Sequence, residues 1–111
     1  MVDKNRLYQV ISNLLSNAIK FTNSGSINIT LEKDISDNKI SMHIRDTGQG
    51  IDQSILPKIF SKFVTKSKEG TGLGLFISRS IILAHGGNIW AENNKDGKGA
   101  TFSFSLPLIY Q

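Results

Sequence analysis

The sequence predicts an α+β fold, a two-layer sandwich in which helices cover one face of a mixed, mostly antiparallel sheet. Two segments carry apolar residues every three or four positions, as amphipathic helices do, and two pairs of segments alternate apolar and polar residues, as half-buried strands do. Strand pairs separated by helices are typical of this fold class. The 111 residues, 39% of them hydrophobic, are expected to form a single domain, residues 1–111, with one core.

The first helix is predicted between Leu7 and Ile19, and Asp3 is its expected N-cap. A hairpin follows, because apolar and polar residues alternate at 27–31 and again at 40–44, on either side of a Ser-Asp-Asn turn. The second of these strands ends at Asp46, where the chain enters a glycine cluster.

A short helix is predicted at residues 54–63, with Asp52 as its cap and Pro57 in its first turns. The polar stretch at residues 65–69 that follows is expected to be a mobile loop.

A further helix is predicted for residues 73–85, because dense apolar spacing ends there at two glycines. The last two strands begin at Ile89 and near Phe102, and a glycine-containing turn at residues 93–99 joins them. We expect Trp90 to lie in the core together with the aromatic residues of the last strand.

Charge and composition restrict the class of ligand. The net charge of +4 comes from basic residues spread along the chain, so neither nucleic acid nor direct membrane contact is expected, whereas a small anion fits. No cysteine is present, which excludes disulfides and cysteine-based metal sites. Because no apolar run approaches about 18 residues, we expect a soluble, cytoplasmic piece.

Two glycine clusters, DTGQG at residues 46–50 and GTGLGL at residues 70–75, suit a polyphosphate ligand. Glycines let the backbone turn tightly and bring its N–H groups close to a ligand, and a following helix adds its partial positive charge. Each cluster alone is equally compatible with ordinary turns. Neither matches the dinucleotide-binding fingerprint, and the GxxxxGK[ST] phosphate loop is absent.

Polar residues form a stripe along the first helix beside its apolar face. On a helical wheel Arg6, Asn13, Asn17 and Lys20 fall within an arc of about 60°. Such a stripe is often only a solvated face. It could also serve a metal nucleotide, because an amide oxygen can ligate Mg²⁺ and an ammonium group can pair with phosphate.

The position of Asp46, at the end of a strand and before two glycines, suggests a carboxylate at a sheet edge with room for a flat ring beside it. An ionised carboxylate only accepts hydrogen bonds, so it would select the exocyclic amino group of adenine over the carbonyl of guanine. The alternative is that Asp46 merely starts a turn.

Five segments occur here in one order: NLLSNAIKFT (13–22), DTGQGI (46–51), IFSKF (59–63), GTGLGL (70–75) and GKGATFSF (97–104). In that order they resemble the catalytic ATP-binding domain of two-component sensor histidine kinases, a Bergerat-fold family related to DNA gyrase. The resemblance covers nearly the whole chain. The family usually has one more strand before the first helix, so we expect an N-terminally truncated fragment with an unpaired sheet edge through which it could form a homodimer.

The resemblance implies that ATP and Mg²⁺ bind here. Asn17 would coordinate Mg²⁺, Asn13 would lie beside the phosphates, Lys20 would contact a phosphate, and Phe21 would pack against the nucleotide, while Asp46 would bind the adenine amino group. Glycines and neighbours would shape the pocket, anchor a lid and present amides to the triphosphate, and a threonine would reach the adenine side through water. These residues are Gly48, Gly50, Ile51, Phe60, Phe63, Gly70, Thr71, Gly72, Leu73, Gly74, Leu75 and Thr101.

By the same resemblance, the catalytic residues Asn13, Asn17 and Lys20 would help to transfer the γ-phosphoryl group to a histidine on a partner dimerisation domain, with a response regulator downstream. ATPase relatives usually carry a glutamate that activates water where this chain has Asn13, which favours transfer over hydrolysis. His43 and His85 are expected to be structural. Two alternatives remain: a nucleotide-binding module without kinase activity, and an anti-sigma-type serine kinase.

Overall fold

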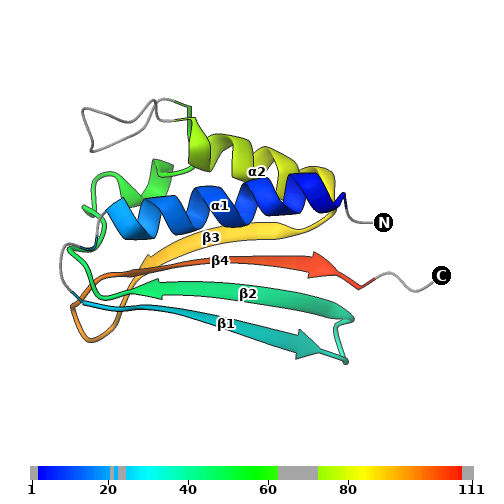
Figure 1. Cartoon of the computed structure of the whole chain (residues 1–111), viewed down its shortest axis with the longest axis horizontal. Coiled ribbons are helices and arrows are strands. Elements are labelled where there is room, and N and C mark those ends of the chain that lie inside the picture. Colours follow the sequence, from blue (N-terminus) through cyan, green and yellow to red (C-terminus); the bar gives the residue numbers. More distant parts are fainter. Residues whose placement is uncertain (1–2, 21, 23–24, 63–72, 109–111) are drawn as a thin grey trace.

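The computed structural model describes residues 3–20, 22, 25–62 and 73–108. It has two layers, an antiparallel sheet and two helices that lie side by side on one of its faces (Figure 1). The elements in chain order are α1 (Lys4–Lys20), β1 (Ile27–Asp34), β2 (Lys39–Asp46), the 3-10 helix η1 (Leu56–Lys58), α2 (Gly74–Ala84), β3 (Asn88–Asn93) and β4 (Ala100–Pro107). The predicted α+β sandwich is therefore confirmed. In the described part of the chain every strand pairing is antiparallel, so the expected mixed sheet is not seen there.

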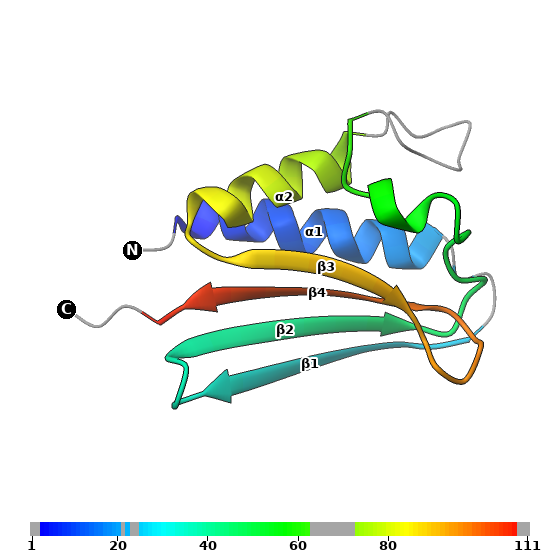
Figure 2. The same cartoon turned by 180° about the vertical axis from the view of Figure 1, so that it is seen from behind.

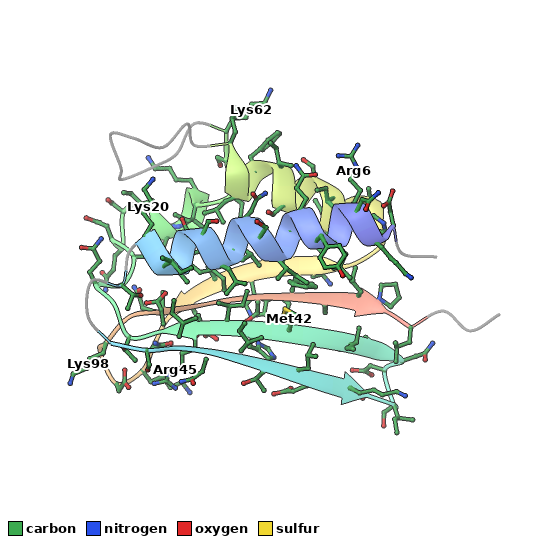
Figure 3. The ribbon with its side chains drawn as sticks, viewed as in Figure 1. Arg6, Lys20, Met42, Arg45, Lys62 and Lys98 are labelled. Carbon is green, nitrogen blue, oxygen red and sulfur yellow. The ribbon has the colours of Figure 1, made fainter. Side chains whose placement is uncertain are left out.

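The strand order is β1-β2-β4-β3, so the last strand of the chain is inserted beside β2 (Figure 2). The register sets Ile44 opposite Phe102 and Met42 opposite Phe104. These side chains face the helices, because alternate residues of a strand point to the same face. Figure 3 shows Met42 between the strands and α1.

The core forms where α1 packs on β2 and α2 packs on β3 and β4. Its most buried side chains come from both layers: Val10, Leu14, Ala18, Ile44, Ile82, Ala100, Phe102, Phe104 and Leu106. Leu14 is fully buried, and truncating such a leucine to alanine typically costs about 2–5 kcal/mol. The core thus fixes α1 over β2 and α2 over β3 and β4, and leaves β1 beyond α1 at the edge.

The start of α1 is capped as predicted. Asp3 Oδ1 accepts hydrogen bonds from the N–H groups of Asn5 at 3.0 Å and Arg6 at 3.2 Å. The Asp3 N–H donates to His85 Nε2 at 3.2 Å, and His85 Nδ1 lies 2.8 Å from the carbonyl oxygen of Ile81. His85 therefore joins the start of α1 to the end of α2.

The helix expected at residues 54–63 is much shorter in the structure. The described part of this segment contains one 3-10 turn, Leu56–Lys58, held by bonds between residues three apart, such as Lys58 N–H to the Ile55 carbonyl at 2.9 Å. Pro57 has no N–H, so it cannot continue an α-helical ladder here. The polar stretch at residues 65–69 lies outside the described residues.

Trp90 is not in the core, contrary to expectation. It is 37% exposed, whereas its neighbours Ile89 and Ala91 pack against the core. Alternate residues of β3 point to opposite faces, so Trp90 lies on the face of the sheet away from the helices. There it makes an edge contact with the ring of His43, at 6.2 Å between ring centroids.

No helix of the described residues is long and apolar enough to span a membrane.

Candidate functional site

Most of the predicted site residues that the structure describes gather at one end of the molecule. The last turn of α1, the end of β2, the start of α2 and the turn between β3 and β4 all lie there (Figure 1). Lys20 extends from this end of α1, and Lys62 lies beside the first turn of α2 (Figure 3). Phe21, Phe63, Gly70, Thr71 and Gly72 lie outside the described residues.

The carboxylate of Asp46 is the buried charge at this end. The side chain is 3% exposed, and its Oδ1 accepts hydrogen bonds from Gly48 N–H at 2.9 Å and Ala100 N–H at 3.3 Å. No described residue donates a hydrogen bond to Oδ2. A carboxylate oxygen can accept up to two hydrogen bonds, so Oδ2 has capacity for an N–H donor from outside the chain.

Close contacts require two glycines at this end, Gly50 of the predicted pocket and Gly99, which was not predicted as a site residue. Gly99 has a φ of 77°, and a Cβ there would overlap the main-chain oxygen of Asp46. Gly50 has a φ of 81°, and a Cβ would lie 3.1 Å from Asn93 Oδ1. The β3–β4 turn and the DTGQG loop can therefore approach each other and Asp46 only because side chains are missing at these positions.

Two neighbouring asparagines at the end of β3 also build the site, although the sequence analysis did not single them out. Asn93 Oδ1 accepts the N–H of Ile51 at 2.7 Å, and its Nδ2 donates to the Ile51 carbonyl at 2.8 Å. Asn94 Nδ2 donates to the Asp46 carbonyl at 2.8 Å. Their only signal in the sequence is a pair of turn-forming residues before Gly97.

Thr101 has a different place from the one predicted. It pairs with Arg45 across the ladder, so it lies on the sheet face opposite the Asp46 carboxylate. Its hydroxyl donates to Asn94 Oδ1 at 2.6 Å. We therefore correct its assignment: Thr101 supports Asn94 from behind and does not face the pocket.

Asn13 links the two helices. Its Nδ2 donates to the carbonyl of Gly74 and to Ser78 Oγ, both at 3.2 Å, and Ser78 is fully buried. These two hydrogen bonds hold the first turn of α2 beside the polar stripe of α1. Asn17 belongs to the same stripe and lies one helical turn after Asn13. No described residue donates a hydrogen bond to Asn13 Oδ1.

The first turn of α2 carries backbone N–H groups that no bond within the helix uses. Leu73 is its N-cap and provides no side-chain cap, and the first helical bond runs from Ile77 N–H to the Leu73 carbonyl at 2.8 Å. The N–H groups of Gly74, Leu75 and Phe76 precede that bond and have no partner within the helix. Three such donors, with the positive end of the helix dipole, suit phosphate oxygens.

The segment before the glycine loop is anchored on the core. Phe60 meets the ring of Phe102 edge to face, at 6.3 Å between centroids, and Ile51 also packs against the core. Lys62 Nζ lies 5.3 Å from the ring centroid of Phe76, a cation–π contact with the first turns of α2.

The donor set suits Mg²⁺ bound together with phosphate. The described residues include no group of three or more His, Cys, Asp or Glu side chains that could hold a metal by themselves. Mg²⁺ usually keeps several waters and takes only one or two protein oxygens beside substrate phosphates. The Asn17 side chain is half-buried and forms no hydrogen bond with a described residue, so its Oδ1 fits that role.

A further unsatisfied group lies at the same end of the molecule. Thr22, just after α1, has a buried Oγ1 without a hydrogen-bond partner among the described residues. With Asp46 Oδ2 and the open start of α2, this end holds several polar groups whose bonding capacity is unused.

Residues 2–109 match the family model described as histidine kinase-, DNA gyrase B- and HSP90-like ATPase. The chain belongs to this family. It is 39% identical over 109 residues to the sensor protein FixL of Bradyrhizobium diazoefficiens, covering 96% of this chain and 21% of FixL. It is 36% identical over 114 residues to the sensor histidine kinase WalK of Bacillus subtilis, covering 96% of this chain and 18% of WalK.

Solved structures agree with this family. The catalytic domain of the histidine kinase ThkA superposes with a TM-score of 0.84 at 42% identity, over 96% of this chain and 68% of the ThkA chain. Full-length ShkA in complex with AMPPNP superposes with a TM-score of 0.82 at 34% identity, over 95% of this chain and 22% of ShkA. The chain is thus a histidine-kinase ATPase domain, as predicted, and it spans about a fifth of the length of FixL and WalK.

Proposed function

We propose that this domain binds Mg-ATP and donates the γ-phosphoryl group to a histidine on the dimerisation domain of a parent two-component sensor kinase. The observation that carries the proposal is the buried residue Asp46, whose Oδ1 is fixed by backbone N–H groups and whose Oδ2 accepts no hydrogen bond from a described residue. An acceptor oxygen at this position suits the amino group of adenine and disfavours the carbonyl of guanine.

The other half of the site suits the triphosphate. The open first turn of α2 offers Gly74 and Leu75 N–H groups, and Asn13 and Ser78 hold that turn beside α1. Asn17 would hold Mg²⁺. The ion would neutralise the negative charge that develops on the phosphoryl group during transfer. Lys20 lies at the same end of α1 and would add a positive charge near the phosphates (Figure 3).

Transfer to a protein fits this helix better than hydrolysis. Residues 4–20 contain no aspartate or glutamate, so α1 carries no carboxylate that could act as a general base on water. The amide of Asn13 cannot accept a proton at neutral pH, and its Nδ2 is engaged with α2. Catalysis then consists of positioning and charge neutralisation, and the attacking nitrogen comes from the partner histidine.

The experiment mixes this domain with the separately purified dimerisation domain of its parent kinase and γ-labelled ATP in Mg²⁺. Acid-labile label on the partner is the expected result. Saturable ATP binding without transfer would support a nucleotide-binding module instead, and acid-stable label would indicate a serine kinase. Absence of any adenine-nucleotide binding by the folded domain would refute the proposal as a whole. We place this activity in the cytoplasm, with a response regulator as the next acceptor.

A further inference from the structure

The side chain of Asn94 ties three separate segments of the chain together. Its Nδ2 donates to the Asp46 carbonyl at 2.8 Å, at the end of β2, and to the Lys98 carbonyl at 2.7 Å, in the β3–β4 turn. Its Oδ1 accepts the hydroxyl of Thr101 on β4 at 2.6 Å. The three hydrogen bonds of this amide are all short, between 2.6 and 2.8 Å.

The chemistry of the partners fixes the orientation of this amide. Main-chain carbonyl oxygens only accept hydrogen bonds, so the NH₂ group of Asn94 must face Asp46 and Lys98. The amide oxygen then faces Thr101, which must use its hydroxyl proton as the donor. The arrangement has one self-consistent assignment, and each partner supports the others.

These contacts hold the main chain of Asp46, which carries the carboxylate. Asn94 fixes the Asp46 carbonyl, Gly99 packs against the same oxygen, and the next residue, Ala100, donates its N–H to Asp46 Oδ1. The direction of Oδ2 therefore depends on how firmly the β3–β4 turn is held against the end of β2.

The other side-chain link between this turn and β2 is weaker. Asp96 pairs with Arg45 at 2.8 Å, but their side chains are 52% and 48% exposed. Exposed ion pairs contribute little because solvent screens them and their side chains lose entropy. Asn94 and Thr101 are half-buried and use short, uncharged bonds.

We propose that Asn94, oriented by Thr101, is the positioning residue that aims the Asp46 carboxylate at the purine and thereby sets selectivity for adenine. This inference rests on the proposed nucleotide site. Asn94 acts through the main chain of Asp46 and does not itself touch the nucleotide.

The test compares ATP and GTP affinities of the full chain and its Asn94→Ala variant by calorimetry in Mg²⁺, with a thermal melt of each protein. ATP affinity of the variant falls about five- to thirtyfold, the range expected when one or two hydrogen bonds that position an acceptor are lost, while the weaker GTP affinity changes little. The ATP-to-GTP ratio therefore falls. The control is Asn38→Gly, which removes an amide bond to the Leu108 carbonyl at 2.6 Å at the other end of the sheet and keeps the positive φ of 55°. It lowers only the melting temperature.

Thr101→Val keeps the proposal testable if Asn94→Ala fails to fold. The change removes one hydroxyl on the face away from the pocket, and Thr30→Val is the matched change on the exposed part of that face. A lower ATP-to-GTP ratio in Thr101→Val, unchanged in Thr30→Val, supports the inference. A folded variant of Asn94 or Thr101 with the ratio of the original chain overturns it. If the original chain binds no adenine nucleotide, the proposed function itself fails, which is a separate result.

Discussion

Replacing Asp46 by asparagine tests the adenine site with the smallest change in shape. In the structure, Oδ1 accepts two backbone N–H groups, from Gly48 and Ala100. An asparagine must keep its only acceptor oxygen at that position, because an NH₂ group there would meet two donors. Its NH₂ group is then forced into the position of Oδ2, where it faces the amino group of adenine, donor against donor.

The size of the effect follows from the bond that is lost. A hydrogen bond to a charged group contributes about 1.5–3 kcal/mol, which is a decrease in ATP affinity of about 10- to 150-fold. The fold itself should change little, since both backbone bonds to Oδ1 survive the substitution. The loss therefore appears in binding and not in the melting temperature.

The assay is calorimetry of Asp46→Asn with ATP, ADP and GTP, with and without Mg²⁺. Asp96→Asn is a matched control, because Asp96 Oδ1 also accepts an N–H two residues on, from Lys98 at 3.0 Å, and lies in the neighbouring turn. Both variants lose one negative charge. The reasoning is refuted if folded Asp46→Asn binds ATP as tightly as the original chain, or if Asp96→Asn loses as much affinity.

Three further predictions use the same protein. Asn17→Ala lowers the Mg²⁺-dependent part of ATP affinity by about tenfold, because it removes a metal-ligand oxygen; Asn5→Ala, at an exposed position in the first turn of α1, does not. An unchanged response of ATP affinity to Mg²⁺ in a calorimetric titration of Asn17→Ala would show that Asn17 is not the ligand. Gly99→Ala lowers the free energy of unfolding in urea by at least about 2 kcal/mol, because the new Cβ would overlap the main chain at the end of β2, whereas Gly97→Ala, at a φ of 83° with no atom within 4 Å, shows only the cost of the backbone conformation. Equal losses of stability in the two variants would contradict the close contact at Gly99. β1 is an edge strand and its Leu31 is 61% exposed, which predicts concentration-dependent self-association that Leu31→Lys weakens. Light scattering that shows only monomer at all concentrations would contradict this prediction.

The elements could be predicted from the sequence where their signal is local. The apolar spacing of α1 and its cap at Asp3 depend on residues within a few positions of each other, and the structure confirms both. The 3-10 turn at Leu56–Lys58 is shorter than the helix predicted at residues 54–63, because Pro57 suits the first turn of a helix but has no N–H with which to continue the α-helical bonds.

The errors at Trp90 and Thr101 have a common cause. Trp90 is expected in the core because it is aromatic, and Thr101 is expected in the pocket by family resemblance, although alternation along the strands already decides the direction of both side chains. Phe102 faces the core, so Thr101 must face away from it, and Ile89 faces the core, so Trp90 must also face away. The directions of both side chains can therefore be predicted from the sequence, provided that the alternation of side chains along a strand is given more weight than residue type.

The role of Asn94 could not be obtained in this way. Its bond to the Asp46 carbonyl joins residues 48 positions apart, and it exists because β4 is inserted beside β2. No local pattern specifies that insertion. Residues whose function depends on sheet order become visible only once the strands are placed.

Among the described residues, the two ends of the molecule differ in the bonding of their polar groups, and this difference supports the proposed site without reference to sequence motifs. At one end, Asp3, His85 and Asn38 bond to other parts of the chain. At the other end, Thr22 Oγ1 is buried without a described partner, and Asp46 Oδ2 receives no hydrogen bond from a described residue. Leaving a buried polar group such as Thr22 Oγ1 unpaired costs about 1–3 kcal/mol, and a ligand bound at this end would also find an acceptor in Asp46 Oδ2. Asp46 Oδ2, beside Gly48, suits a donor group, and the first N–H groups of α2 suit an anion; an adenine nucleotide carries both.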